Sequence, residues 1–260
     1  MAILERHDTG GIAHLHLNSP GNLNALSDEM LAALQAQIDA LSQDRETRVV
    51  ILSGEGKAFC AGHDLKQMQA ARGDADGGKA YFQDLFTRCA RVMTGLTRLP
   101  QPVIAQVHGI ATAAGCQMVA SCDMAVAAEG TRFGVNGVNI GLFCSTPMVA
   151  LTRNIHRKKA FEMLTTGQFL STDEALEQGL INHAVPAEAL ETRTRDLAET
   201  VAAKLSAAVK IGKSAFYDQM TMSLEDAYAF AGNVMVENML WRDTDEGINA
   251  FIEKRKPDWA

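Results

Sequence analysis

Short apolar runs alternate with long amphipathic stretches over residues 13–127, and this alternation restricts the folds open to the chain. Residues 49–52, 103–105 and 124–127 are runs typical of buried strands. Between them, helical spacing links Leu31 to Leu41, and a second helical stretch ends before Pro100. Such an order predicts an α/β fold with a largely parallel sheet.

Helical patterns dominate the chain after residue 145. Ser171 and Glu174 form a capping-box pattern, and residues 190–205 repeat apolar positions at helical spacing. The last segment is rich in methionine, which suits either core filling or a contact between subunits: Met220, Met222, Met235 and Met239. We therefore expect a mostly helical final third.

Composition excludes several classes of protein. The 260 residues are 47% hydrophobic and carry a net charge of -7, which argues against nucleic-acid binding because the basic stretches, such as residues 153–159, are short. No apolar run is long enough to cross a membrane. The five cysteines form no C-x-x-C pair, so we expect free thiols, no metal, and a cytosolic protein. His14 and His16 share a strand face but lack a third ligand.

Two loops rich in small residues follow predicted strands. Residues 54–65 and 107–117 each lead from a strand into a helix, where unpaired N–H groups favour a negatively charged oxygen. Together they can form an oxyanion hole, although the same glycines and alanines also suit tight turns and close packing. The first loop does not have the spacing of a phosphate-binding loop.

Several separated motifs together resemble the crotonase, or enoyl-CoA hydratase/isomerase, superfamily. They lie at residues 57–66, 102–105, 109, 115–116, 122–123, 133–134, 141 and 246–257, and residues 141–147 further resemble one branch of that superfamily. The resemblance implies a crotonase (ClpP-like) fold, a spiral of β-β-α units with a helical C-terminal region. It also implies a core over residues 1–195, a trimerisation region over 196–260, and assembly as a homotrimer or hexamer.

The resemblance also implies a substrate and its binding residues. The substrate is an acyl-CoA thioester, with coenzyme A as part of it and no separate cofactor. The backbone N–H groups of His63 and Ala114 would bind the thioester oxygen. Coenzyme A would lie along a set of residues in the first half of the chain, with two more reaching a neighbouring subunit's ligand: Asn22, Leu23, Ala25, Ala61, Asp64 and Leu65, then Phe251 and Lys254.

The chain departs from the superfamily at both positions where its hydratases carry a catalytic glutamate. Gln117 and Gly137 stand there, and neither can exchange a proton at ordinary pH. We therefore expect an enzyme of the hydratase/isomerase class with weak hydratase activity. The alternatives are an acyl-CoA-binding protein without efficient catalysis and a thioester hydrolase that uses Cys144 as its nucleophile. Ser145 stands where some members place an acidic catalytic residue.

Overall fold

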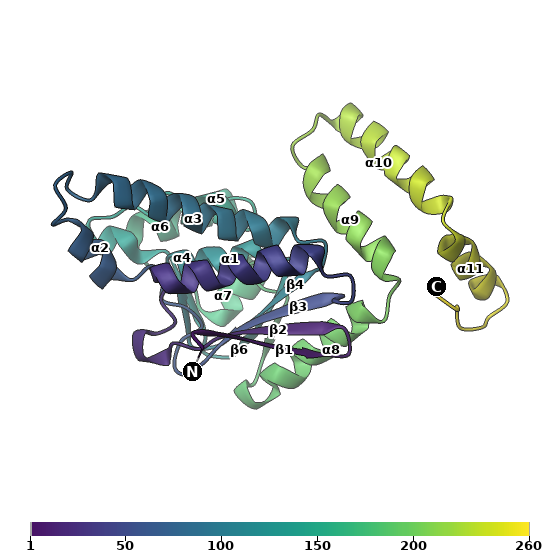
Figure 1. The fold of residues 1–260 in the computed structure, drawn as a ribbon, viewed down its shortest axis with the longest axis horizontal. Helices are drawn as coiled ribbons and strands as arrows, with labels where there is room; N and C mark the ends of the chain where they lie inside the picture. The colour runs from purple at the N-terminus through teal and green to yellow at the C-terminus, as the bar shows by residue number, and fades with distance from the viewer. Residues whose placement is uncertain (1, 260) are drawn as a thin grey trace.

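The computed structural model describes residues 2–259 and confirms the predicted α/β fold (Figure 1). One sheet has the strand order β1-β2-β3-β4-β6-β8, and all pairs after the antiparallel β1–β2 hairpin are parallel. Its strands are β1 (Leu4–Thr9), β2 (Ile12–Leu17), β3 (Val49–Gly54), β4 (Val103–Val107), β6 (Met124–Ala128) and β8 (His183–Val185). A second sheet pairs β5 (Ile110–Thr112) with β7 (Arg132–Gly134).

Helices cover both faces of the six-stranded sheet. The core helices are α1 (Asp28–Gln43), α2 (Leu65–Ala71), α3 (Lys79–Arg98), α4 (Ala114–Ser121), α5 (Pro147–Leu151), α6 (Arg157–Thr166), α7 (Thr172–Glu177) and α8 (Leu190–Ala202). Short 3-10 helices are η1 (Pro20–Asn22), η2 (Asn136–Ile140) and η3 (Ala187–Ala189). Every residue of β3 is buried, as expected for a strand covered on both faces.

The predicted spiral of β-β-α units is visible in the chain order. Strands β4 and β5 lead into α4, and β6 and β7 lead into η2 and α5. Cys60 forms an isolated bridge with Ala111 between β3 and α2, which repeats the pattern once more. In each unit the second extended segment leaves the six-stranded sheet, and these segments pair with one another.

Two apolar clusters fill the two sides of the main sheet. The larger one includes the buried face of α1, whose Ser27 caps the helix by accepting from the N–H of Met30 at 3.2 Å. The smaller cluster packs α8 against the opposite face through Leu190, Ala198 and Ala202. Because α8 packs on the sheet as one helix, the expected division after residue 195 falls inside it.

The last three helices project from this body as an arm (Figure 1). We define the arm as α9 (Ser206–Gln219), α10 (Leu224–Met239) and α11 (Arg242–Ile252). One buried side chain of α9, Lys213, ties it to the body by donating to Asp123 at 2.7 Å and to the carbonyl oxygens of Leu96 and Gln101. Tyr217 also donates to Asp123, at 2.8 Å.

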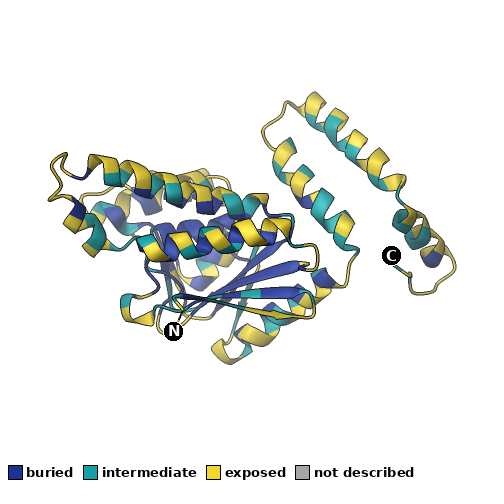
Figure 2. Cartoon of the chain, viewed as in Figure 1, coloured by how far each residue is buried: buried dark blue, intermediate teal, exposed yellow. Residues whose placement is uncertain are grey.

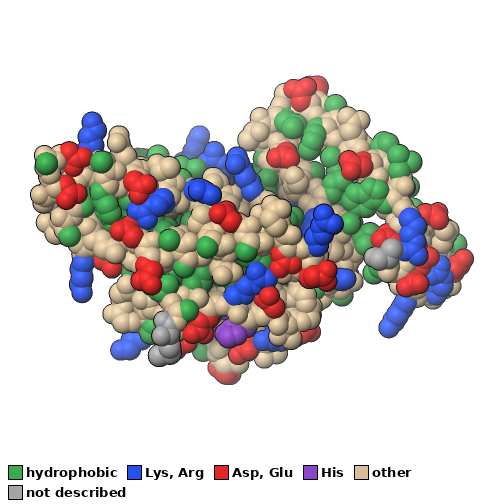
Figure 3. Space-filling model, viewed as in Figure 1, with side chains coloured by type: hydrophobic (Ala, Val, Ile, Leu, Met, Phe, Trp, Pro, Cys, Tyr) green, Lys and Arg blue, Asp and Glu red, His purple; other side chains and the backbone are tan. Residues whose placement is uncertain are grey.

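The arm exposes most of its surface within a single chain (Figure 2). All four methionines of the Met-rich segment are at least 39% exposed, so the core-filling interpretation is wrong for the isolated chain. Apolar side chains gather over this part of the molecule (Figure 3). No helix in residues 2–259 is both long and apolar enough to span a membrane.

Candidate active site

The two predicted loops run side by side. The N–H of Cys60 donates to the carbonyl oxygen of Ile110 at 3.3 Å. The N–H of Thr112 donates to the carbonyl oxygen of Cys60 at 3.0 Å. Gly115 approaches Cys60 so closely that a Cβ at this position would collide with the Cys60 carbonyl oxygen. The small residues therefore permit close packing and, by that packing, bring the two loop ends together.

The N–H groups of His63 and Ala114 lie at this meeting point. Ala114 is the first residue of α4, and a Cβ built on Gly62, next to His63, would lie 3.3 Å from the Ala114 nitrogen. Within residues 2–259 neither N–H donates to a backbone acceptor. The positive end of the α4 dipole adds to their field. A free donor at the start of α4 and a second one on the loop packed against it form an arrangement that suits a negatively charged oxygen.

Backbone conformation explains how alanine fits at position 114. Ala114 has no positive φ, whereas its neighbour Ala113 has φ 50° and ψ -119°, a region that glycine prefers. Alanine at position 114 therefore carries its N–H donor without backbone strain, and the strained residue is Ala113.

The imidazole of His63 has a packing role. Both ring nitrogens are buried, and the ring meets Phe86 edge to face with 5.7 Å between centroids. Burial lowers the pKa of His63, so the ring is neutral near pH 7.

The expected coenzyme A residues of the first half lie on two neighbouring segments, 22–25 and 61–65, which we together call the ridge. The N–H of Ala61 donates to the carbonyl oxygen of Leu23 at 3.0 Å, and the N–H of Leu26 donates to that of Gly62 at 2.7 Å. These bonds bring Asn22, Leu23 and Ala25 beside Ala61. Leu23 is partly exposed and adopts φ 57°, which turns the chain sharply at the ridge.

Asp64 and Leu65 continue this ridge into α2. The carboxylate of Asp64 accepts from the N–H groups of Lys66 at 2.8 Å and Gln67 at 3.2 Å, so it caps α2. Leu65 is exposed at the first position of that helix. Asp64 therefore shapes the loop that carries the His63 N–H.

Gln117 lies one turn into α4, near the two donors. Its side chain is only 4% exposed, and its Oε1 has no hydrogen-bond partner among the described residues. An unpaired buried acceptor is costly unless a donor reaches it. The position suits an uncharged group that accepts a hydrogen bond from a ligand or a water molecule.

Gly137, in η2, has no space for a larger side chain. A Cβ at this position would collide with the carbonyl oxygen of Leu142 and lie 2.8 Å from the Sγ of Cys144. The loop after η2 therefore occupies the space into which a side chain at 137 would extend.

Cys144 does not have the properties of an activated nucleophile. Burial raises the pKa of its thiol, whereas a nucleophilic cysteine needs a lowered one. Helix α5 begins only at Pro147, and no described histidine hydrogen-bonds the thiol. These features do not favour the hydrolase alternative, which stays a prediction. Ser145 is exposed, and its hydroxyl donates only weakly, at 3.4 Å, to the carbonyl oxygen of Phe143.

Phe251 and Lys254 lie apart from the other expected coenzyme A residues. Phe251 is in α11 and Lys254 follows that helix, on the opposite side of the molecule from α2 (Figure 1). Phe251 is 85% exposed. They cannot reach the site of their own chain in this arrangement, so any contact with a ligand requires another subunit.

Sequence reasoning missed several residues that shape this site. Buried Asn24 accepts from the N–H of Ser19 and donates to the carbonyl oxygens of Glu55 and Ala58, at 2.8–2.9 Å. Thr112 donates to the Oδ1 of Asn136 at 2.7 Å and so joins β5 to η2. The sequence shows an asparagine shortly before a predicted helix, but the burial of Asn24 and the contact of Thr112 with Asn136 both depend on tertiary packing.

An apolar pocket of about 390 Å³ adjoins His63. Side chains of α2, α3 and the segment after η2 line it, and the sequence pattern gave no indication of it. Phe86, which packs on His63, is one of them. The pocket therefore lies along α2 and reaches the His63 ring through Phe86.

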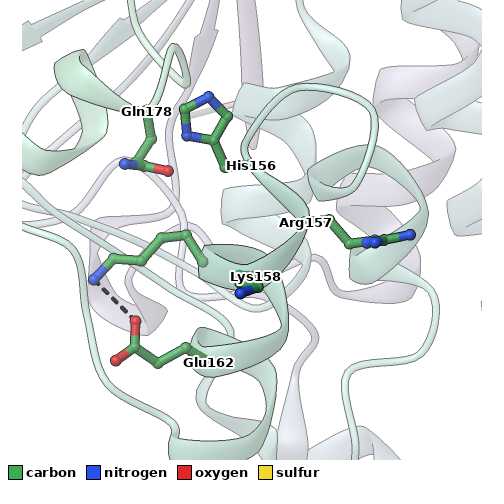
Figure 4. Close-up of a pocket in the computed structure, with 6 residues that line it drawn as sticks. His156, Arg157, Lys158, Glu162 and Gln178 are labelled. Atoms are coloured by element: carbon green, nitrogen blue, oxygen red, sulfur yellow. Dashed lines mark ion pairs between the residues drawn. The ribbon is translucent and has the colours of Figure 1, made fainter.

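A larger pocket, of about 690 Å³, lies at the start of α6 and contains none of the expected site residues (Figure 4). Its Lys159 ammonium pairs with Glu162 at 3.1 Å and with Glu174 at 3.3 Å. Arg157 points away from this pair (Figure 4).

Within residues 2–259 no cluster of three or more histidine, cysteine or acidic side chains could hold a metal ion.

Comparison with known proteins defines the family. Residues 7–260 match the enoyl-CoA hydratase/isomerase family, and the chain belongs to that family of enzymes. A curated relative from Xenopus laevis, named enoyl-CoA hydratase domain-containing protein 3, mitochondrial, is 48% identical over 96% of this chain and 83% of its own length. This confirms the branch that residues 141–147 indicate.

Solved structures agree with the fold. A crystal structure of an enoyl-CoA hydratase from Mycobacterium smegmatis has a TM-score of 0.95 and 50% identity, covering 99% of this chain and 98% of that one. Human enoyl-CoA hydratase domain-containing protein 3 has a TM-score of 0.94 and 43% identity, covering 99% of this chain and all of that one.

The expected cytosolic location is wrong, because the curated Xenopus relative is named mitochondrial. Free thiols suit any reducing compartment, so the features behind that prediction could not separate the two locations.

Proposed function

We propose that the chain binds an acyl-CoA thioester and stabilises its enolate between the N–H groups of His63 and Ala114. The observation that carries this proposal is the pair of free donors where the two loops pack together. The packing is so close that a Cβ added to Gly62, next to His63, would lie 3.3 Å from the Ala114 nitrogen. Negative charge that develops on the thioester oxygen would be held by both donors and by the helix dipole.

We also propose that the chain hydrates simple enoyl-CoA esters only slowly. Adding water across a double bond needs groups that activate the water and deliver a proton, and each such group contributes roughly 100- to 10,000-fold in rate. Gln117 can hold a water molecule but not take its proton, and Gly137 offers nothing. The oxyanion site and substrate positioning then supply most of the remaining catalysis.

Acetoacetyl-CoA tests the enolate site without requiring turnover. Its enolate absorbs in the near ultraviolet, so a site that stabilises the enolate raises this absorbance on binding. We expect that rise, and we expect acetoacetyl-CoA to bind at least about tenfold more tightly than an S-alkyl-CoA thioether without the carbonyl. Equal binding of both compounds with no new absorbance would contradict the proposal.

A role in binding without catalysis is the second candidate. It is favoured by Gly137, because Leu142 and Cys144 fill the space in which a catalytic side chain would lie. Retained binding of acyl-CoA esters together with no product after long incubation would select it over the enzyme proposal.

We also propose that the arm mediates self-association as a trimer or hexamer. Apolar residues along it are strongly exposed in one chain, including Tyr228 at 75%, Leu240 at 81% and Phe251 at 85%. In an assembly, the end of the arm would bring Phe251 and Lys254 to a neighbouring site.

A further inference from the structure

The apolar pocket beside His63 has an inner and an outer end. At the inner end, the Phe86 ring stands edge to face on His63, whose N–H is one of the two proposed donors. From there the pocket follows α2 past Leu65 and Met68, with Leu142 contributing from the segment after η2. An acyl chain whose thioester carbonyl lies at His63 and Ala114 would therefore extend along α2.

Arg72 lies at the outer end of this pocket. It follows the last residue of α2, and its guanidinium carbon is 5.9 Å from the centroid of the Phe82 ring. It is the one charged side chain among the described residues that line the pocket, and it forms no ion pair or hydrogen bond within residues 2–259.

The neighbouring acidic residues do not neutralise Arg72. The carboxylate of Asp76 accepts from the N–H groups of Gly78 and Ala80, both at 2.9 Å, and thereby caps α3. Asp74 forms no ion pair with Arg72 in the described chain. An unpaired guanidinium beside apolar walls favours a carboxylate, which it can bind through two hydrogen bonds.

We propose that the acyl group taken by this site ends in a carboxylate that pairs with Arg72. This inference rests on the proposed function, which places the thioester carbonyl at the two donors. Helix α2 and its cap advance about 10 Å from Leu65 to Arg72, at 1.5 Å per residue. An extended chain covers about 3.5 Å with every three bonds, so the distance suits the CoA ester of a diacid of roughly eight to ten carbons.

A matched pair of ligands tests the inference. Suberyl-CoA and octanoyl-CoA both carry eight acyl carbons and differ at the far end, where one has a carboxylate and the other a methyl group. We expect the natural protein to bind suberyl-CoA about tenfold more tightly, as measured by calorimetric titration. Arg72→Met should abolish this preference by weakening suberyl-CoA alone, and added salt should reduce it in the natural protein.

Arg45→Met is the control variant, because Arg45 is also exposed and unpaired but lies outside the pocket, between α1 and β3. It should leave the preference unchanged. Equal or tighter binding of octanoyl-CoA by the natural protein would overturn the inference, as would an equal loss for both esters in Arg72→Met. Failure of both esters to bind the folded protein would overturn the proposed function as well.

Discussion

At Gly137 the main chain passes so close to Leu142 and Cys144 that no side chain fits. Restoring the missing acid at this position therefore requires the loop after η2 to move. Gln117 differs, because glutamate has nearly the same shape as glutamine and can enter α4 without such movement. The two departures from the hydratases thus have unequal structural consequences.

Gly137→Glu is expected to lower stability without adding hydratase activity. Forcing atoms into a filled space typically costs about 1–3 kcal/mol. Chemical denaturation and crotonyl-CoA hydration measured on the same sample would check this. A Gly137→Glu variant that is as stable as the natural protein and faster would show that the loop yields easily.

Ala113→Gly is expected to stabilise the protein by about 1 kcal/mol, because φ 50° with ψ -119° costs an alanine more than the added chain entropy of glycine. Thermal unfolding of the two proteins would measure the difference. Ala120→Gly, inside the helix that Ala113 precedes, is the control, and it should destabilise. A lower midpoint for Ala113→Gly would mean that the conformation at 113 carries no strain.

At the scale of elements, pattern reasoning succeeded where a segment is long or wholly buried. The helical spacing from Leu31 to Leu41 lies in α1, and the apolar run at 49–52 lies in β3. Strands β5, β7 and β8 were missed because three residues are too few to show a period, and they depend on partners far along the chain.

The candidate site was likewise predicted only where local sequence defines it. The sequence motifs located the loops of His63 and Ala114, but the pocket along α2 arises only when α2, α3 and the segment after η2 pack together. No local pattern around Arg72 marks it, because its partner Phe82 and the pocket walls come from separate elements.

His14, on a face of β2, gives the stability a pH dependence. Burial lowers the pKa of His14 to about 4 from 6.5, with His16 and Arg195 adding to the shift and Glu191 opposing it. Between these two values the unfolded chain binds a proton that the folded chain does not, so stability falls as the pH falls. Above about pH 6.5 this contribution is complete.

His14→Gln should flatten that decline, since glutamine does not titrate and can still bond Ser53, the partner of His14 at 2.7 Å. Unfolding midpoints measured from pH 7 to pH 4 would compare the two proteins. Parallel curves would mean that His14 does not contribute to the acid sensitivity.

At the scale of the whole molecule, the body and the arm differ in how far their apolar side chains are buried. The body buries its apolar residues around the sheet, whereas α10 has no buried residue in a single chain (Figure 2). Lys213, on α9, anchors the arm to Asp123 of the body. This arrangement agrees with an arm that is completed by other subunits.

Leu240→Asp is expected to convert the assembly to monomers while leaving each chain folded, because Leu240 is 81% exposed on the arm. Light scattering after gel filtration would measure the mass. The control is Leu176→Asp, the same change at an exposed leucine of α7 in the body, which should leave the mass unchanged. A natural protein that is already monomeric would refute the proposed assembly.

The central claim is that this chain retains an oxyanion site but has lost the groups that move protons. Crotonyl-CoA hydration by the natural protein and by Gln117→Glu tests it most directly, with crotonyl-CoA binding measured alongside. We predict slow hydration by the natural protein, a rate at least roughly tenfold higher for Gln117→Glu, and similar binding by both. Hydration by the natural protein at a rate typical of enzymes, about 10 s⁻¹ or more, and unchanged in Gln117→Glu, would contradict the account.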